Sequence, residues 1–147
     1  MAAGLALASP AVSSAATRPA STSALAKQYL RDVAPVNRAI ATWEKQVGAL
    51  KPTDTWAKLG KIDQPLAAAI EKLDRQLRGF RATGKVETAI KRLVYADENF
   101  VADLVTASGQ NLFTGGTWET AVVKDATAMG NAAAAVRRVL GLPPLPR

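Results

Sequence analysis

The chain has 147 residues, a formal net charge of +7, and neither cysteine nor histidine. This composition excludes disulfides, thiolate or imidazole metal sites, and catalysis by Cys–His or Ser–His–Asp groups. Hydrophobic residues make up 48% and charged residues 21%, which is typical of a globular chain rather than a disordered one. Alanine accounts for 30 residues and aromatic residues for only 5%, so we expect one domain of closely packed helices.

The first 16 residues resemble a signal peptide. Ala2–Ala8 is apolar, and the small residues Ser14 and Ala16 fit the pattern before a cleavage site, giving Thr17 as the mature start. No basic residue precedes the apolar stretch, which a start codon assigned too far downstream would explain. Ala6 and Ala8 are a second pair that fits a cleavage site, and an Ala/Ser-rich disordered tail is the alternative to a signal peptide. Residues 17–22 are interpreted as a linker, and the mature chain contains no apolar run long enough for a transmembrane span.

The first helix is predicted from apolar residues that alternate at spacings of four and three. This is the pattern of a helix packed along one face. Pro35 lies inside the pattern without shifting its phase, so we expect one kinked helix, with a break after Asp32 as the alternative. The apolar positions are Tyr29, Val33, Val36, Ile40, Trp43, Val47 and Leu50.

A second helix is expected to begin at Asp63, a favourable N-cap, with Pro65 in its first turn. Before it, a short turn would carry Trp56 and Leu59. The second helix repeats the spacing of four and three through Leu66, Ile70, Leu73, Leu77 and Phe80, and Gly79 or Gly84 would end it.

Two further helices follow. Thr83 is the predicted cap of the third helix, and a polar, glycine-rich loop over residues 108–116 separates it from the fourth. Thr117 would cap the fourth helix and Gly141 would end it, since Pro143 and Pro144 cannot continue a helix. Residues 23–142 are therefore predicted to form an all-α, antiparallel up-down-up-down four-helix bundle, followed by a Pro-rich tail at 143–147. A three-helix core with a loosely docked first helix is the alternative.

Three segments of the chain resemble those of small exported helical proteins of actinobacteria. They are YLRDVAPVNRAI (29–40), LVYADENFVADL (93–104) and VLGLPP (139–144). The resemblance is compositional and spans most of the predicted mature chain. It implies an exported helical domain and supplies no activity or functional residues.

Basic residues are expected to gather at the end of the bundle where the first helix begins and the fourth ends. Such an end would attract an anionic envelope polymer, a membrane surface or another envelope protein. Cations are also favoured at helix C-termini without any partner, and nucleic acid is the least favoured ligand because no aromatic residues interleave the cluster. The predicted basic residues are Lys27, Arg31, Arg75, Arg78, Arg81, Lys85, Arg137 and Arg138.

The opposite end is predicted to be aromatic. Trp56, Phe113 and Trp118 fall on or next to its two loops, with Trp43 about two turns inside. These side chains either close the last layer of the core or line a small apolar pocket.

Asp97 interrupts the apolar face of the third helix. Its helical phase places it between Leu93 and Phe100, so we expect it to be buried and to require a partner. At the height of Asp97 along the bundle, the first helix presents residues 37–43. We therefore predict that Asp97 is hydrogen-bonded to Asn37, with Trp43 as the second choice, and that this bond fixes the register of the first and third helices.

These observations favour a non-enzymatic, exported helical-bundle protein that binds or scaffolds at the cell envelope, without a cofactor. An intracellular basic bundle that binds nucleic acid or phospholipid is the alternative. An enzyme of unrecognised type is the least favoured interpretation, because no catalytic constellation is present in the sequence.

Overall fold

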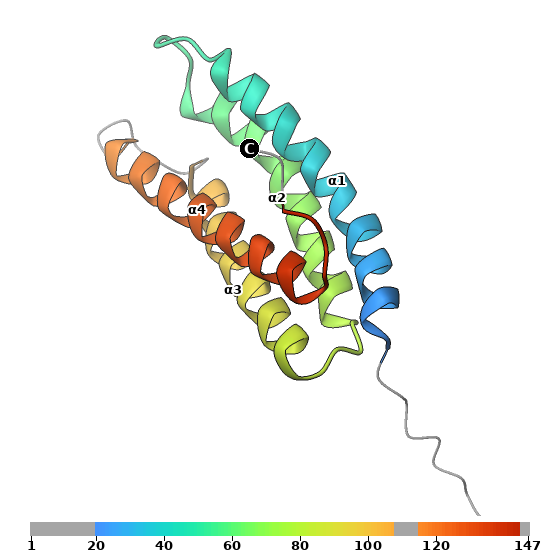
Figure 1. Cartoon of the computed structure of the whole chain (residues 1–147). Coiled ribbons are helices and arrows are strands. Elements are labelled where there is room, and N and C mark those ends of the chain that lie inside the picture. The colour runs from blue at the N-terminus through green and yellow to red at the C-terminus, as the bar shows by residue number, and fades with distance from the viewer. Residues whose placement is uncertain (1–19, 108–114, 145–147) are drawn as a thin grey trace, which may run out of the picture.

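The described part of the chain folds into four helices, each antiparallel to the next. The computed structural model describes residues 20–107 and 115–144, and within these ranges it contains α1 (Thr22–Gly48), α2 (Trp56–Arg78), α3 (Gly84–Ala107), α4 (Gly115–Val139) and no strand. Successive helices run in opposite directions, which confirms the predicted all-α up-down-up-down bundle (Figure 1). The predicted signal peptide, Phe113 and residues 145–147 lie outside the described residues.

Helix α1 is continuous through Pro35, which confirms the prediction of one helix and makes the alternative, a break after Asp32, wrong. Its first turn is capped by Ser21, whose hydroxyl accepts a hydrogen bond from the Ala24 N–H at 3.2 Å. Tyr29, Val33 and Val36 are buried on both sides of the proline. Core packing therefore stabilises the helix where the proline removes one backbone donor.

Helix α2 begins seven residues earlier than predicted, at Trp56 rather than after Asp63. Thr55 is its N-cap, and its hydroxyl accepts from the Lys58 N–H at 3.3 Å. Asp63 lies buried within the helix and caps nothing. The prediction failed because the Asp63 carboxylate accepts a hydrogen bond from a side chain of α1 instead of a backbone N–H of its own first turn.

The end of α2 and both ends of α4 lie at or within two residues of the predicted positions. Gly79 follows α2 as predicted, and α4 begins two residues before the predicted cap, Thr117. Gly141 has φ of +69°, and the Leu142 N–H donates to the Arg137 carbonyl at 2.9 Å. This left-handed glycine with a hydrogen bond spanning the last turn is a Schellman motif, and it confirms Gly141 as the residue that ends α4.

The core is continuous along α2 and α3, and its most buried large side chains are Tyr29, Leu66, Ile70, Leu77, Leu93, Phe100, Leu104 and Val136. The first half of α1 belongs to this core, so the alternative with a loosely docked first helix is wrong for that half. The second half of α1 is different, because Ile40, Trp43 and Val47 are only half-buried.

The bundle has a closed end and an open end. At the closed end the Ala20 N–H donates to the Arg81 carbonyl at 3.2 Å, and Arg137 of α4 lies close enough to Tyr29 of α1 to affect its ionisation. At the open end, which carries residues 49–55 and the start of α4, the α1–α2 hairpin leans away from α4 (Figure 1). This separation positions the pocket described next.

Candidate functional site

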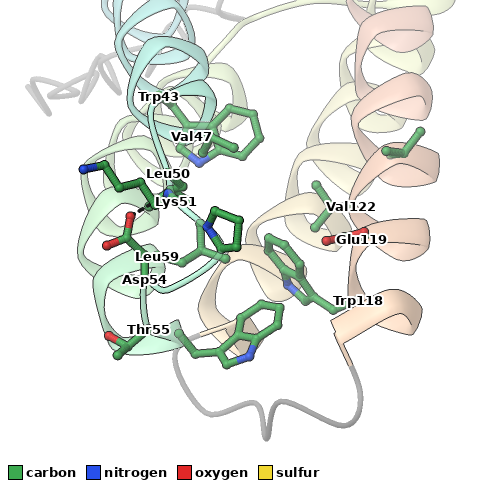
Figure 2. Close-up of a pocket in the computed structure, with 13 residues that line it drawn as sticks. Trp43, Val47, Leu50, Lys51, Asp54, Thr55, Leu59, Trp118, Glu119 and Val122 are labelled. Atoms are coloured by element: carbon green, nitrogen blue, oxygen red, sulfur yellow. Dashed lines mark hydrogen bonds between the residues drawn. The ribbon is translucent and has the colours of Figure 1, made fainter.

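A pocket of about 560 Å³ occupies the open end. Figure 2 shows side chains from the α1–α2 hairpin on one side of it and side chains from α4 on the other. The lining is mainly apolar and includes Trp43, Val47, Leu50, Pro52, Trp56, Leu59, Trp118, Val122 and Val123. Its volume lies within the range of roughly 300–1,000 Å³ that is usual for small-molecule sites.

Three tryptophans line this pocket, named here the tryptophan pocket. Trp56 and Trp118 make an edge-to-face contact with ring centroids 5.4 Å apart, although they come from different helices. The Trp118 indole N–H donates to the Asp103 carbonyl at 2.7 Å, which fixes the ring. Trp43 packs edge-to-face on Phe100 at 6.3 Å. The structure thus brings together the predicted Trp56 and Trp118, with Trp43 beside them, whereas Phe113 lies outside the described residues.

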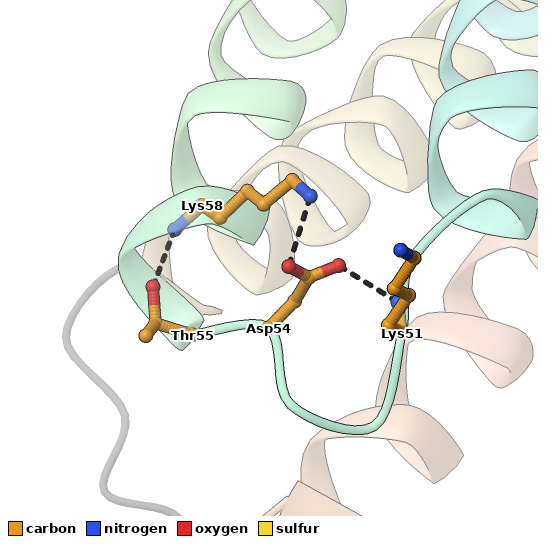
Figure 3. A network of polar contacts seen from close by, with 4 residues as sticks. All are labelled: Lys51, Asp54, Thr55 and Lys58. Atoms are coloured by element: carbon orange, nitrogen blue, oxygen red, sulfur yellow. Dashed lines mark hydrogen bonds and ion pairs between the residues drawn. The ribbon is translucent and has the colours of Figure 1, made fainter.

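The loop between α1 and α2 carries a small polar network at the edge of the pocket (Figure 3). Asp54 accepts a hydrogen bond from the Lys51 backbone N–H at 2.7 Å and forms an ion pair with Lys58 at 2.9 Å. The backbone hydrogen bond, followed by the contact with Lys58, lowers the pKa of Asp54. Asp54 therefore stays ionised, and its charge is balanced within the loop.

Glu119 is the other acidic residue that lines the pocket. Figure 2 shows its carboxylate between the Trp118 and Val122 side chains, on the side of α4 that faces the pocket. Glu119 is exposed, and within residues 20–107 and 115–144 it forms no ion pair. Among the described residues, Glu119 is thus an acidic group of the pocket lining without an ion-pair partner.

Asp97 is buried, as its helical phase predicted, with 1% of its surface exposed. Its predicted partners are wrong, because Asn37 is exposed to solvent and Trp43 donates its indole N–H to Asp63 at 2.6 Å. Asp97 instead contacts Asp74, a buried carboxyl group on α2. The height of Asp97 along the bundle does not specify which neighbouring helix its side chain faces, and the prediction chose α1 where the partner lies on α2.

The carboxyl groups of Asp74 on α2 and Asp97 on α3 form a buried, interacting pair. Burial, followed by repulsion from Asp74, raises the pKa of Asp97 far above its ordinary value of 3.8. Burial also raises the pKa of Asp74, while a hydrogen bond from Asp97 opposes that rise. Asp97 is therefore protonated at neutral pH and donates to the Asp74 carboxylate.

A further buried carboxyl group, that of Asp63, is hydrogen-bonded by Trp43 alone among the described side chains. Burial raises the pKa of Asp63 to about 6, and the hydrogen bond from Trp43 partly opposes this. Its second oxygen, Oδ2, is buried without a hydrogen-bond partner. In the part of the chain that the structure describes, no group of three or more acidic residues is arranged to hold a metal ion.

The burial of two acidic residues of α2, Asp63 and Asp74, was not predicted from the sequence. Each lies three or four positions from the buried residues Leu66, Ile70 and Leu77, and hence on the same face of α2. This spacing was a sufficient signal for both. For Asp63, the prediction of a helix cap took precedence over this spacing.

The predicted basic residues lie toward the closed end, but three of them are engaged within the molecule. Arg31 pairs with the buried Asp32 at 3.1 Å, Arg78 pairs with Glu98, and the Arg137 Nε–H donates to the Pro143 carbonyl at 2.6 Å. The remaining five are exposed and form none of the ion pairs seen among the described residues; they are Lys27, Arg75, Arg81, Lys85 and Arg138.

No protein-family model, curated protein or solved structure matches this chain. Across the two described ranges, none of the helices is both long enough and apolar enough to cross a membrane. The tryptophan pocket, which gathers all three tryptophans of the chain, is the site from which a function is proposed.

Proposed function

We propose that the protein is a non-enzymatic binding protein that takes up a small apolar ligand in the tryptophan pocket. The observation that carries this proposal is the opening between the α1–α2 hairpin and α4, which leaves three indoles and several aliphatic side chains around a volume of about 560 Å³. Such surface is normally buried in a bundle core, and an apolar ligand would gain roughly 25 cal/mol for each Å² that it removes from water.

A neutral probe tests this proposal. We expect 1-octanol to bind in calorimetric titrations, and Trp56→Ala to weaken its binding about tenfold, since about 50 Å² of lost apolar contact corresponds to roughly 1.3 kcal/mol. Val123→Ser, at a pocket residue that is 67% exposed, should weaken binding without affecting folding. Leu30→Ser is the matched control on the outer surface of α1.

The proposal fails if 1-octanol does not bind, or if it binds equally well to all three variants with unchanged helical content by circular dichroism.

We further propose that the protein is exported and acts at the cell envelope. This rests on the apolar segment and small residues before Thr17, together with the resemblance to exported helical proteins. N-terminal sequencing of the mature protein from envelope and culture fractions tests it, and Thr17 is the expected first residue. An intact Met1 on a protein confined to the cytosol would contradict export.

The basic end supports a second candidate function, binding to an anionic phospholipid surface, in an intracellular or exported protein. Its support is the five exposed cationic side chains without ion pairs, together with the net charge of +7. We expect vesicles containing anionic lipid to bind the protein at low salt and to release it at high salt. Arg75→Gln combined with Arg81→Gln and Arg138→Gln should weaken that binding, and salt-insensitive binding would contradict this function.

A further inference from the structure

We infer that the tryptophan pocket prefers an organic cation, in which an ammonium group is carried on a small apolar body. This inference rests on the proposed function and adds the charge of the ligand. It follows from the charges and hydrogen-bond donors that the pocket leaves available.

The first observation is the position of Glu119. Near the start of a helix a carboxylate is favoured by the helix dipole, so its presence there alone indicates no ligand. The direction of its side chain is informative, because its carboxylate lies between Trp118 and Val122 on the pocket side of α4 (Figure 2). A cation within the pocket would balance this charge close to apolar walls, where charge attraction is screened less than in bulk water.

The other two charged residues that line the pocket, Asp54 and Lys51, do not oppose a preference for a cation. Asp54 is already balanced by Lys58, at 2.9 Å (Figure 3). Lys51 is the one cationic residue of the lining, and Figure 2 shows its side chain extending away from the tryptophans. The unbalanced charge that faces the indoles is therefore negative.

Hydrogen-bond donors for an anion are scarce in the pocket. The indole N–H groups of Trp43 and Trp118 donate to Asp63 and to the Asp103 carbonyl, and the Lys51 backbone N–H donates to Asp54. Among the indoles, only that of Trp56 has an N–H without a hydrogen-bond partner. An anionic group would lose its hydration in this pocket without gaining the donors that it needs.

Indole rings add a positive reason for a cation. The faces of aromatic rings carry partial negative charge, and tryptophan attracts ammonium groups most strongly among the aromatic side chains. A pocket lined by three tryptophans and by a carboxylate that forms no ion pair with any described residue thus has the components that recognise quaternary ammonium compounds.

The experiment compares probes that share one chain and differ in charge. Octyltrimethylammonium, octanesulfonate and 1-octanol are titrated separately into the full chain, at concentrations where each is monomeric. The net charge of the whole protein is +7 and attracts the anionic probe. Tighter binding of the cationic probe must therefore come from groups in the pocket itself. We expect octyltrimethylammonium to bind roughly three- to tenfold more tightly than octanesulfonate, and the difference to narrow at high salt.

Glu119→Gln should remove this preference while leaving 1-octanol affinity unchanged. Glu44→Gln is the matched control, because it removes the same charge from an exposed position of α1 that does not line the pocket. Loss of the preference in Glu119→Gln but not in Glu44→Gln would support the inference.

Equal binding of the cation and the anion, with 1-octanol still bound, would overturn the inference and leave the proposed function intact. The same is true if the preference survives in Glu119→Gln. Failure of all three probes to bind would overturn both.

Discussion

Asp97 and Asp74 are the residues that most affect how the protein responds to pH. Two carboxyl groups from facing helices lie buried against each other, and no described lysine or arginine is buried in the core to compensate them. Glu98 beside them adds negative charge, Arg78 partly offsets it, and Tyr29 of α1 lies near enough for its own pKa to be affected. The native state is therefore stabilised when this pair holds a proton.

The first prediction concerns stability against pH. The folded protein binds a proton at Asp97 that the unfolded chain releases near pH 4, so the free energy of unfolding should fall as pH rises from about 4 toward the raised pKa of Asp97. Asp63 and Asp74 contribute in the same direction up to about pH 6. Urea unfolding at a series of pH values between 4.5 and 8.5 measures this slope.

Asp97→Asn should reduce that slope by up to about 1.4 kcal/mol per pH unit, because it removes one titrating proton and keeps a donor toward Asp74. Glu44→Gln, at an exposed position of α1 that does not affect the pKa of Asp74 or Asp97, is a control that should change the slope much less. A wild-type protein whose stability rises between pH 5 and pH 8 would show that the pair is not buried as described.

The second prediction separates a hydrogen bond from aromatic packing. Trp43→Phe retains an aromatic ring beside Phe100 but removes the donor to Asp63, so we expect it to destabilise the fold by about 1–3 kcal/mol. Trp56→Phe is the matched control, because the Trp56 N–H has no hydrogen-bond partner in the described structure. Denaturant unfolding of both variants measures the difference, and equal losses would contradict a specific role for the Trp43–Asp63 bond.

At the scale of helices, two glycines of the last helical segment should respond to alanine with opposite signs. Gly141 has φ of +69°, so Gly141→Ala should destabilise the protein by about 1–2 kcal/mol. Gly130 lies inside α4, with nothing within 4 Å of an added Cβ, so Gly130→Ala should stabilise it by about 0.5–1 kcal/mol. Thermal unfolding of the two variants tests this, and a shift in the same direction for both would refute the structure of this segment.

Helix existence was predictable from the sequence, whereas helix boundaries and partners were predictable only in part. Apolar spacing of four and three requires one buried helical face, and this local pattern located all four helices and the burial of Asp97. The start of α2 was misplaced because Asp63 has the chemistry of a cap. Its actual partner, Trp43, lies on another helix and is determined by tertiary packing that the spacing does not contain.

At the scale of the whole molecule, the open end carries the tryptophan pocket and the closed end carries the basic residues. The grouping of Trp56 with Trp118 followed from topology alone, since an up-down bundle brings the first and third loops to one end. The pocket itself was not predictable in detail, because it depends on α1 and α4 separating toward that end (Figure 1). The basic end was predictable as a cluster, but not the internal pairing of Arg31, Arg78 and Arg137.

The central claim, that the open end binds an apolar ligand, is tested most directly by the indole N–H signals in a two-dimensional ¹H–¹⁵N NMR spectrum. The chain has three tryptophans, so each can be assigned by a single Phe substitution and followed separately. Titration with octyltrimethylammonium should shift the Trp56 and Trp118 signals most, with saturation at one common affinity. Shifts confined to backbone signals of the closed end, with all three indole signals unmoved, would contradict the account.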